Sequence, residues 1–336
     1  MTSTTPQNAP FGSILADVMA ITWYRNGQWE PSELKAVGPI EIHPAAHVLH
    51  YGSECFEGFK AYKWADGSVH VFRMDKHLER LKQSARNLLL PEPDADQVAE
   101  MVLSVVERSR AAVPEAPGAL YIRPLLFGTM PNIGAATTPT DEACLVVLAS
   151  PVWDYFSGGG KPLSIYIEEH ATRCASQLGI VKTGGNYAAA LGPTLAARRD
   201  HKADQVLFCP NGEVQEAGAA NFLAIRDGHI LTRGLDRTFL HGVTRDSLLK
   251  LAPVLGYRVE ERNFTVDELL EWAKTGEAAL SGTAAVLSGV GTLIRGNQSY
   301  RVGSGEIGPN TKRLRAALLA IQQGTSPDLH GWLRRV

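Results

Sequence analysis

Two short segments hold the residue types that could do chemistry together. The first, residues 181–187, reads Val-Lys-Thr-Gly-Gly-Asn-Tyr and offers the amine of Lys182 beside two glycines and the phenol of Tyr187. A lysine can attack a carbonyl group when desolvation or nearby positive charge lowers its pKa. Consecutive glycines let the backbone pass close to a planar ligand. Alone, this pattern is more often that of a surface lysine beside a turn.

The second segment, residues 216–222, reads Glu-Ala-Gly-Ala-Ala-Asn-Phe and follows a predicted strand. The local pattern turns Glu216 inward, and an apolar strand begins at the end of the segment. A carboxylate against the ring nitrogen of a pyridine keeps that nitrogen protonated through a charge-assisted hydrogen bond. A protonated ring is an electron sink for a carbanion. A lysine and a buried acid are therefore what a pyridoxal 5'-phosphate (PLP) site needs.

Three further places could hold an anion. Gly242, Val243 and Thr244 stand at the start of a predicted helix, where unpaired amides and the helix dipole favour negative charge. The alternative there is a plain N-cap threonine after a turn. Residues 281–285, Ser-Gly-Thr-Ala-Ala, offer free amides in a loop, although such a sequence is also common in turns. Arg80 lies on the polar side of a predicted helix, where a solvated arginine is the alternative.

Three histidines raise a different hypothesis, a metal site. His43, His47 and His50 are spaced by four and three residues, which could place their imidazoles on one helical face. Pro44 and residues 38–39, Gly-Pro, argue against a helix, and no acid joins the set. We therefore expect no metal ligand here.

Composition restricts the class of protein. The chain has 336 residues, enough for two domains, and its 44% apolar and 20% charged residues are typical of a soluble globular protein. A net charge of −2 gives no reason to expect nucleic acid or an anionic membrane as a partner. The apolar run at residues 144–149 is too short to span a bilayer, and residues 1–12 resemble no signal peptide.

The four cysteines favour a reducing compartment. Cys55, Cys144, Cys174 and Cys209 lie far apart, and most have apolar neighbours. Reduced core residues are thus expected in place of disulfides or zinc ligands. A cytoplasmic location follows as an expectation.

Secondary-structure signals occur on both sides of one glycine-rich linker. Apolar periodicity predicts helices over residues 75–90, 94–110, 187–200, 244–255, 265–274 and 310–323. It predicts strands over residues 20–24, 28–29, 70–73, 120–127, 143–152, 163–167, 205–209, 214–216, 221–225 and 229–232. The first helix has an apolar stripe formed by Leu78, Leu81, Ala85, Leu88 and Leu89. Mixed strands and helices in both halves predict an α+β protein of two domains.

The predicted domain bounds follow from the linker at residues 157–162, Ser-Gly-Gly-Gly-Lys-Pro. Residues 1–19 are expected to be a flexible tail. Residues 20–156 are expected to form a small N-terminal α/β domain, and residues 163–336 a larger, PLP-binding domain.

Taken in order, these motifs resemble the fold-type IV PLP enzymes, and among them the branched-chain amino acid aminotransferases. Residues 49–62, 72–81 and 121–124 match the family's early motifs. The lysine and glutamate segments, residues 242–245 and residues 281–284 follow in the same order. Any one motif alone is weak, but an ordered set covering residues 20–330 is specific. The resemblance implies a mixed sheet or barrel with packed helices in each domain.

The resemblance implies a role for each cofactor-binding residue. Lys182 would hold PLP as a Schiff base (aldimine) and then move the proton between the substrate α-carbon and the cofactor C4' carbon. Glu216 would pair with the pyridine nitrogen, and Tyr187 with the phenolic oxygen. Arg80 would clamp the phosphate bidentately. The remaining contacts are further phosphate donors and a side chain beneath the ring: Val243, Thr244 and Thr283 for the phosphate, and Leu240 for the ring.

The resemblance also implies a substrate pocket. Its aromatic wall would comprise Tyr51, Phe56, Tyr121 and Tyr155. Arg123 would accept the distal carboxylate of glutamate, and the amides of Ala284 and Ala285 would hold the α-carboxylate. A loop containing Ile133, Gly134 and Ala135 would enter the neighbouring subunit's pocket, which implies a homodimer and leaves further assembly open.

The implied reaction is PLP-dependent transamination of L-leucine, L-isoleucine and L-valine with 2-oxoglutarate or L-glutamate, by a ping-pong mechanism. The alternatives within the fold are a D-amino acid aminotransferase and a 4-amino-4-deoxychorismate lyase, and a non-enzyme alternative is a metal- or B6-binding protein. Two positions depart from the family. Ala219 and Ala220 replace a frequent Thr-Met and should widen the pocket locally, and Ala285 and Ser288 stand where mammalian members carry a Cys-x-x-Cys pair.

Overall fold

The computed structural model describes residues 9–153 and 160–336, and its chain divides into two compact units. The first unit comprises Met1–Tyr155, Val181–Gly184 and Ile321–Val336. The second comprises Phe156–Ile180 and Gly185–Ala320. The predicted bounds placed everything after residue 162 in one domain. In the structure the lysine segment groups with the first unit, because its backbone hydrogen-bonds there, and the last residues add a strand to the same sheet.

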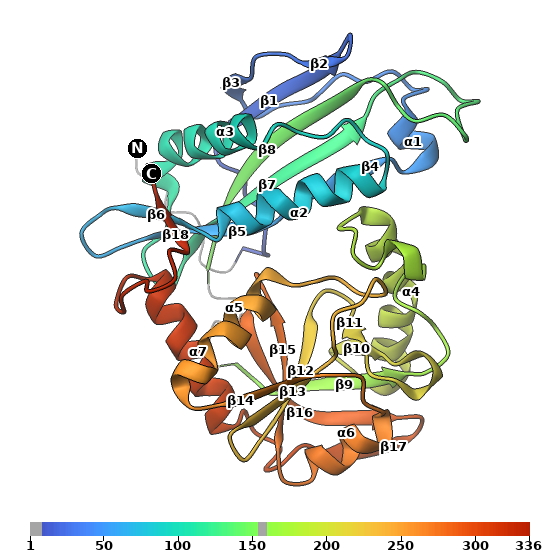
Figure 1. Cartoon of the computed structure of the whole chain (residues 1–336), viewed down its shortest axis with the longest axis vertical. Coiled ribbons are helices and arrows are strands. Elements are labelled where there is room, and N and C mark those ends of the chain that lie inside the picture. The colour runs from blue at the N-terminus through green and yellow to red at the C-terminus, as the bar shows by residue number, and fades with distance from the viewer. Residues whose placement is uncertain (1–8, 154–159) are drawn as a thin grey trace. The chain divides into compact units, whose positions relative to one another are not determined.

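The first unit is built on one antiparallel sheet in the order β18-β6-β5-β7-β8-β1-β2, with β3 paired to β1 and β4 to β7 (Figure 1). Its strands are β1 (Val18–Arg25), β2 (Gln28–Trp29), β3 (Glu33–Ala36), β4 (Glu54–Phe56), β5 (Phe59–Lys63), β6 (Val69–Phe72), β7 (Ala119–Gly128), β8 (Ala143–Val152) and β18 (Leu333–Arg335). The strands predicted at residues 20–24 and 28–29 are confirmed and pair as a hairpin, and Asn26 and Gly27 at its turn both have positive φ.

Three helices accompany this sheet: α1 (His47–Tyr51), α2 (Met74–Asn87) and α3 (Ala95–Arg108). Alternate residues of the central strands, such as Leu120 and Ile122, bury one face of the sheet against α2 and α3. The predicted apolar stripe of α2 is wrong at its end. Leu89 is 65% exposed because the helix ends at Asn87 and Leu89 takes a positive φ.

The second unit contains a closed ring of strands. Its strands are β9 (Leu163–Glu168), β10 (Gln205–Phe208), β11 (Glu216–Ala217), β12 (Asn221–Arg226), β13 (His229–Thr232), β14 (Arg258–Glu261), β15 (Glu277–Gly282), β16 (Val286–Arg295) and β17 (Gln298–Arg301). The order β11-β10-β9-β16-β15-β12 closes because β12 also pairs with β11. Parallel and antiparallel pairs both occur, so this sheet is mixed. The predicted α+β class with a mixed sheet or barrel is confirmed.

The helices of the second part of the chain are α4 (Gly184–His201), α5 (Val243–Leu251), α6 (Val266–Ala273) and α7 (Pro309–Gln322). Short 3-10 turns occur at Arg110–Ala112, Ser176–Leu178, Pro210–Gly212 and Pro253–Leu255. The helix predicted over residues 265–274 is confirmed as α6, and the Thr265 side chain caps it by accepting a hydrogen bond from the backbone N–H of Glu268. The four cysteines are buried and free, as predicted. Across residues 9–153 and 160–336, none of the helices combines the length and apolar character that crossing a membrane requires.

Candidate active site

The backbone of Lys182 is fixed on both sides by the first unit. Its N–H donates to the Ser84 hydroxyl on α2 at 3.1 Å, and its carbonyl accepts from the Phe56 N–H of β4 at 3.0 Å. The side chain is half-buried, and its Nζ lies 4.9 Å from the centre of the Phe56 ring. These bonds use only the backbone, so the amine can react without loosening the segment.

Glu54 anchors the residues that follow the lysine. Its Oε1 accepts hydrogen bonds from the Thr183 hydroxyl, at 3.0 Å, and from the backbone N–H of Gly184. A Cβ at Gly184 would lie 2.6 Å from the same oxygen, so only glycine allows this close approach. The side of Gly184 on which a Cβ would stand thus faces the Glu54 carboxylate.

Arg80 is buried and bound to an acid that the sequence analysis did not single out. Its Nε lies 2.6 Å from Glu57 Oε1, and its Nη2 lies 2.9 Å from Glu57 Oε2. His77 Nδ1 lies 2.7 Å from the same Oε2, and the His77 ring stacks on Phe59. The alternative of a solvated arginine is therefore wrong. Because the Nε–Nη2 edge binds Glu57, a bidentate clamp on a phosphate would have to use the Nη1–Nη2 edge.

The electrostatics of this cluster favour a charged pair. Burial on its own raises the pKa of the Glu57 carboxyl, but the Arg80 guanidinium and then His77 outweigh it, and the pKa lies well below its usual range. Burial lowers the pKa of His77, which therefore stays neutral at pH 7. The cluster holds one anion and one cation, both removed from water.

Arg123, Tyr121 and Phe56 form a second cluster in the same unit. Arg123 Nη2 donates to the Tyr121 hydroxyl at 2.8 Å, and the Arg123 Cζ lies 4.5 Å from the centre of the Phe56 ring. Phe11, which the sequence analysis did not single out, packs edge-on against Tyr121 with ring centres 4.9 Å apart. Three of the predicted substrate residues are thus brought together by the Arg123 guanidinium, which contacts both aromatic rings.

The predicted inter-subunit loop lies beside α1. The Tyr51 hydroxyl donates to the Ile133 carbonyl at 2.5 Å. Ile133 is 70% exposed, whereas Ala135 is buried and its carbonyl lies 3.3 Å from His47 Nε2. Tyr155, the remaining predicted pocket residue, lies outside the described residues.

Glu216 occupies a buried position in the second unit. Its Oε1 accepts from Arg173 Nη1 at 2.9 Å and from the Leu240 backbone N–H at 3.1 Å. Arg173 also donates through Nε to the Gly218 carbonyl, and its Cζ lies 5.4 Å from the centre of the Tyr187 ring. Sequence reasoning missed Arg173, which connects two predicted cofactor residues, because no local pattern distinguishes it.

Burial on its own would lower the pKa of the Arg173 guanidinium. The Glu216 carboxylate and then Tyr187 outweigh that effect, and the pKa is raised above its usual value. Arg173 therefore remains a cation, which stabilises Glu216 as an anion. An ionised carboxylate can accept a hydrogen bond from the N–H of a protonated ring nitrogen.

The start of α5 offers amides that no side chain caps. Gly242 is the N-cap, so the alternative of a capping threonine is wrong, and Thr244 is the second helical residue. Asn221 Nδ2 donates to the Leu240 carbonyl at 2.8 Å and thereby fixes the approach to the helix. A Cβ at Gly242 would lie 2.0 Å from Asn221 Oδ1. Such a helix start suits an anion.

The loop between β15 and β16 is strained. Val286 has a φ of 63°, which a β-branched residue rarely adopts, and Thr283, Ala284 and Ala285 before it are half-buried. The hydroxyl of Ser281 is buried without a hydrogen-bond partner in the described parts of the chain. An unsatisfied donor of this kind suits a site that binds a polar ligand.

The metal hypothesis finds no support in the geometry. No group of three or more His, Cys, Asp or Glu side chains that could hold a metal ion occurs in residues 9–153 and 160–336. A short helix does form over His47–Tyr51, contrary to the argument from Pro44, but each histidine has another partner. His43 Nδ1 accepts from the Ala45 N–H, His47 Nδ1 lies beside the Ser53 hydroxyl, and His50 Nε2 lies beside the Pro44 carbonyl.

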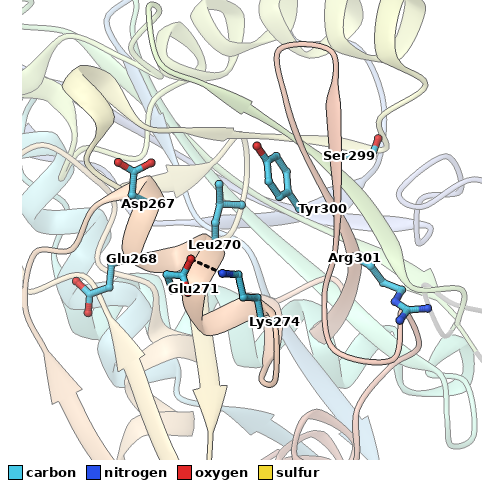
Figure 2. A pocket seen from close by; sticks show the side chains of 8 residues that line it. All are labelled: Asp267, Glu268, Leu270, Glu271, Lys274, Ser299, Tyr300 and Arg301. Atoms are coloured by element: carbon cyan, nitrogen blue, oxygen red, sulfur yellow. Dashed lines mark hydrogen bonds and ion pairs between the residues drawn. The ribbon is translucent and has the colours of Figure 1, made fainter.

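A surface pocket of about 700 Å³ lies between α6 and the β16–β17 hairpin and contains none of the predicted site residues (Figure 2). Four of its charged groups form ion pairs: Asp267, Glu268, Glu271 and Lys274. Lys274 pairs with Glu271, while Asp267 pairs with Arg295. Nothing in this pocket indicates chemistry.

Comparison with known proteins identifies the class. The family model for amino-transferase class IV matches residues 54–292. A branched-chain amino acid aminotransferase from T.th., solved with pyridoxamine 5'-phosphate, superposes with a TM-score of 0.79 at 28% identity, covering 96% of this chain and 99% of that one. The Escherichia coli branched-chain enzyme superposes with a TM-score of 0.78 at 28% identity, covering 95% and 98%. The chain therefore belongs to the class IV aminotransferases.

A sequence relative narrows the assignment. The branched-chain-amino-acid aminotransferase of Mycobacterium tuberculosis is 39% identical over 341 residues, which cover 97% of this chain and 92% of the relative. Within its class the chain thus belongs to the family of branched-chain-amino-acid aminotransferases, as its motifs indicated.

The cofactor of this class, PLP, fits the donor set. An aldehyde needs an amine, and Lys182 supplies one on a fixed backbone. A ring nitrogen needs a buried carboxylate, and Glu216 is 2% exposed. A phosphate needs N–H donors, which the uncapped start of α5 and the Arg80 guanidinium offer.

Proposed function

We propose that this enzyme transfers the amino group of L-leucine, L-isoleucine and L-valine to 2-oxoglutarate in two half-reactions that share one site. The observation that carries the proposal is the Phe56 ring, which has Lys182 Nζ at 4.9 Å and the Arg123 guanidinium at 4.5 Å. An amine that can react and a cation that can bind a carboxylate thus flank an apolar surface. Structures of the T.th. relative with an N-(5'-phosphopyridoxyl)-L-glutamate adduct and with 4-methylvaleric acid support both kinds of substrate.

The proposed cofactor-binding residues divide by the part of the cofactor that each would contact. When bound, PLP supplies a carbonyl carbon that takes up amino groups and a ring that accepts electron density. Lys182 would be the group that moves the proton between the substrate α-carbon and C4' of the cofactor. Glu216, kept anionic by Arg173, holds the proton of the ring nitrogen. The phosphate would be bound by Arg80, Val243, Thr244 and Thr283. The phenolic oxygen would be bound by Tyr187, and the ring face would pack on Leu240.

The proposed substrate contacts divide by chemistry. Tyr51, Phe56 and Tyr121 give an aromatic surface that suits branched aliphatic side chains, while Arg123 accepts the distal carboxylate of glutamate. The amides of Ala284 and Ala285, before the strained Val286, hold the α-carboxylate. That the loop at residues 133–135 serves a neighbouring subunit, and that the enzyme is a cytoplasmic homodimer, stay predictions.

The test of the reaction is a substrate panel with steady-state kinetics. L-leucine, L-isoleucine, L-valine and D-alanine are each supplied with 2-oxoglutarate, and a chorismate-derived amine is supplied alone. Activity confined to the three branched-chain L-amino acids is expected. Turnover of D-alanine or of the chorismate compound at a comparable rate would contradict the proposal.

Double-reciprocal plots at several 2-oxoglutarate concentrations test the shared site. The lines are expected to be parallel, because the first product leaves before the second substrate binds. Intersecting lines would show that both substrates are bound at once and would rule out the two half-reactions.

A further inference from the structure

Gly58 is a buried residue that directly follows Glu57 and precedes β5. The Glu57 N–H donates to the Pro124 carbonyl on β7 at 2.9 Å, and the Gly58 N–H donates to Glu57 Oε2 at 3.1 Å. The first bond holds this dipeptide against β7, and the second ties its backbone to the Glu57 carboxylate. Its backbone position is therefore set by the sheet and by the buried Glu57 carboxylate.

Space, and not backbone conformation, requires glycine here. A Cβ at Gly58 would lie 1.9 Å from the hydroxyl oxygen of Tyr121 and 2.7 Å from its Cζ. The φ of Gly58 does not fall in the left-handed region that excludes other residues. An alanine would thus leave the backbone unstrained and would force the phenol of Tyr121 to move.

The Tyr121 phenol fixes the direction of Arg123. It accepts the hydrogen bond from Arg123 Nη2 at 2.8 Å, and the Arg123 Cζ also lies 5.3 Å from the centre of the Tyr121 ring. Arg123 forms no ion pair with any acid in the described chain, and its buried Nε has no hydrogen-bond partner there. A half-buried guanidinium without a counter-ion is oriented by this hydrogen bond and by its contact with the Phe56 ring, and among the residues described the hydroxyl is the one polar side-chain partner that fixes it.

We propose that Gly58 is a specificity-determining residue, because its missing side chain leaves the space in which Tyr121 holds Arg123 ready for a second carboxylate. The inference rests on the proposed function, in which Arg123 receives the distal carboxylate of glutamate and 2-oxoglutarate. A branched aliphatic side chain would contact the ring of Tyr121 without needing the hydrogen bond from its hydroxyl to Arg123. Gly58 thus matters for the dicarboxylate half-reaction and much less for the branched-chain one.

The test compares two ligands that cannot react. Glutarate represents the dicarboxylate, and 4-methylvalerate represents the leucine skeleton. Calorimetric Kd values are measured on the cofactor-loaded enzyme, with KM values for 2-oxoglutarate and leucine beside them. Gly58→Ala is expected to weaken glutarate binding roughly ten- to hundredfold, the loss of a hydrogen bond to a charged group, with 4-methylvalerate changed less than about threefold.

Matched variants distinguish this effect from a general disturbance. Gly38→Ala places a methyl group where no atom lies within 4 Å and should leave both Kd values unchanged. Tyr121→Phe removes the hydroxyl without adding bulk at Gly58 and should shift the ratio of the two Kd values in the same direction as Gly58→Ala. Equal losses for both ligands in Gly58→Ala would overturn the inference.

Arg123→Gln separates failure of the inference from failure of the proposed function. If Arg123→Gln leaves glutarate binding intact, the proposed role of Arg123 is wrong, and the inference falls with it. If Arg123→Gln weakens glutarate binding but Gly58→Ala does not, the proposed function stands and only the role of Gly58 is wrong.

Discussion

Replacing Lys182 with alanine is expected to lower leucine turnover by on the order of 10³-fold or more, because the residue that moves the proton is removed. The fold should survive, since the hydrogen bonds of Lys182 with Ser84 and Phe56 involve only its backbone N–H and carbonyl. Steady-state rates measure the loss of turnover. Borohydride reduction followed by mass spectrometry shows whether the cofactor is attached to the peptide that contains residue 182.

Two controls make the result specific. Lys182→Arg keeps a cation near the Phe56 ring but lacks a nucleophilic amine, and it should be as inactive as the alanine variant. Lys76→Ala removes an exposed lysine that pairs with Glu79, and it should behave like the unmodified enzyme. A Lys182→Ala enzyme that turned over within about tenfold of the normal rate would remove Lys182 from its proposed role.

Glu57→Gln should lower the thermal unfolding midpoint by roughly 6–20 °C at pH 7, because breaking a fully buried ion pair costs about 3–5 kcal/mol. The variant leaves Arg80 as a buried cation beside a neutral amide. Circular dichroism or calorimetry measures the midpoint. As a control, Glu277→Gln removes a carboxylate that accepts four bonds from Asn310 and Thr311 but pairs with no guanidinium, and it should cost less.

The same pair predicts a pH dependence. The pKa of Glu57 is lowered in the folded protein, so its contribution to stability is complete above the unfolded value of about 4.3 and is lost as the pH falls below it. The difference between the original protein and Glu57→Gln should therefore shrink below about pH 4. A difference that stayed constant down to about pH 3 would show that the charge of Glu57 is not its source.

Much of the fold could be predicted because local signals agree with it. The Asn-Gly turn between β1 and β2, the Asp94 cap of α3 and the long apolar strands β7 and β8 all follow from short patterns. Other elements lack such a signal. β15 and β16 run through alanine, serine and glycine, so their identity depends on pairing with each other and with distant strands.

The candidate site divides in the same way. The motifs pointed to Lys182 and Glu216 because each stands in a distinctive local sequence. Glu57 and Arg173 were missed as members of the site because their importance lies in contacts with residues 23 and 43 positions away. No local sequence pattern reveals a charged residue whose partner is that distant in sequence. Only the folded structure shows that the two side chains are buried together.

The pairing of β18 with β6 has a consequence for synthesis on the ribosome. The nascent chain presents β6 early, but its partner strand, residues 333–335, emerges only after all residues of the second unit. Most multidomain chains fold from the N-terminus as they are made, and an uncovered strand edge invites misassociation. Here the second unit has its full set of residues first, so the unit that begins the chain is the last to be completed.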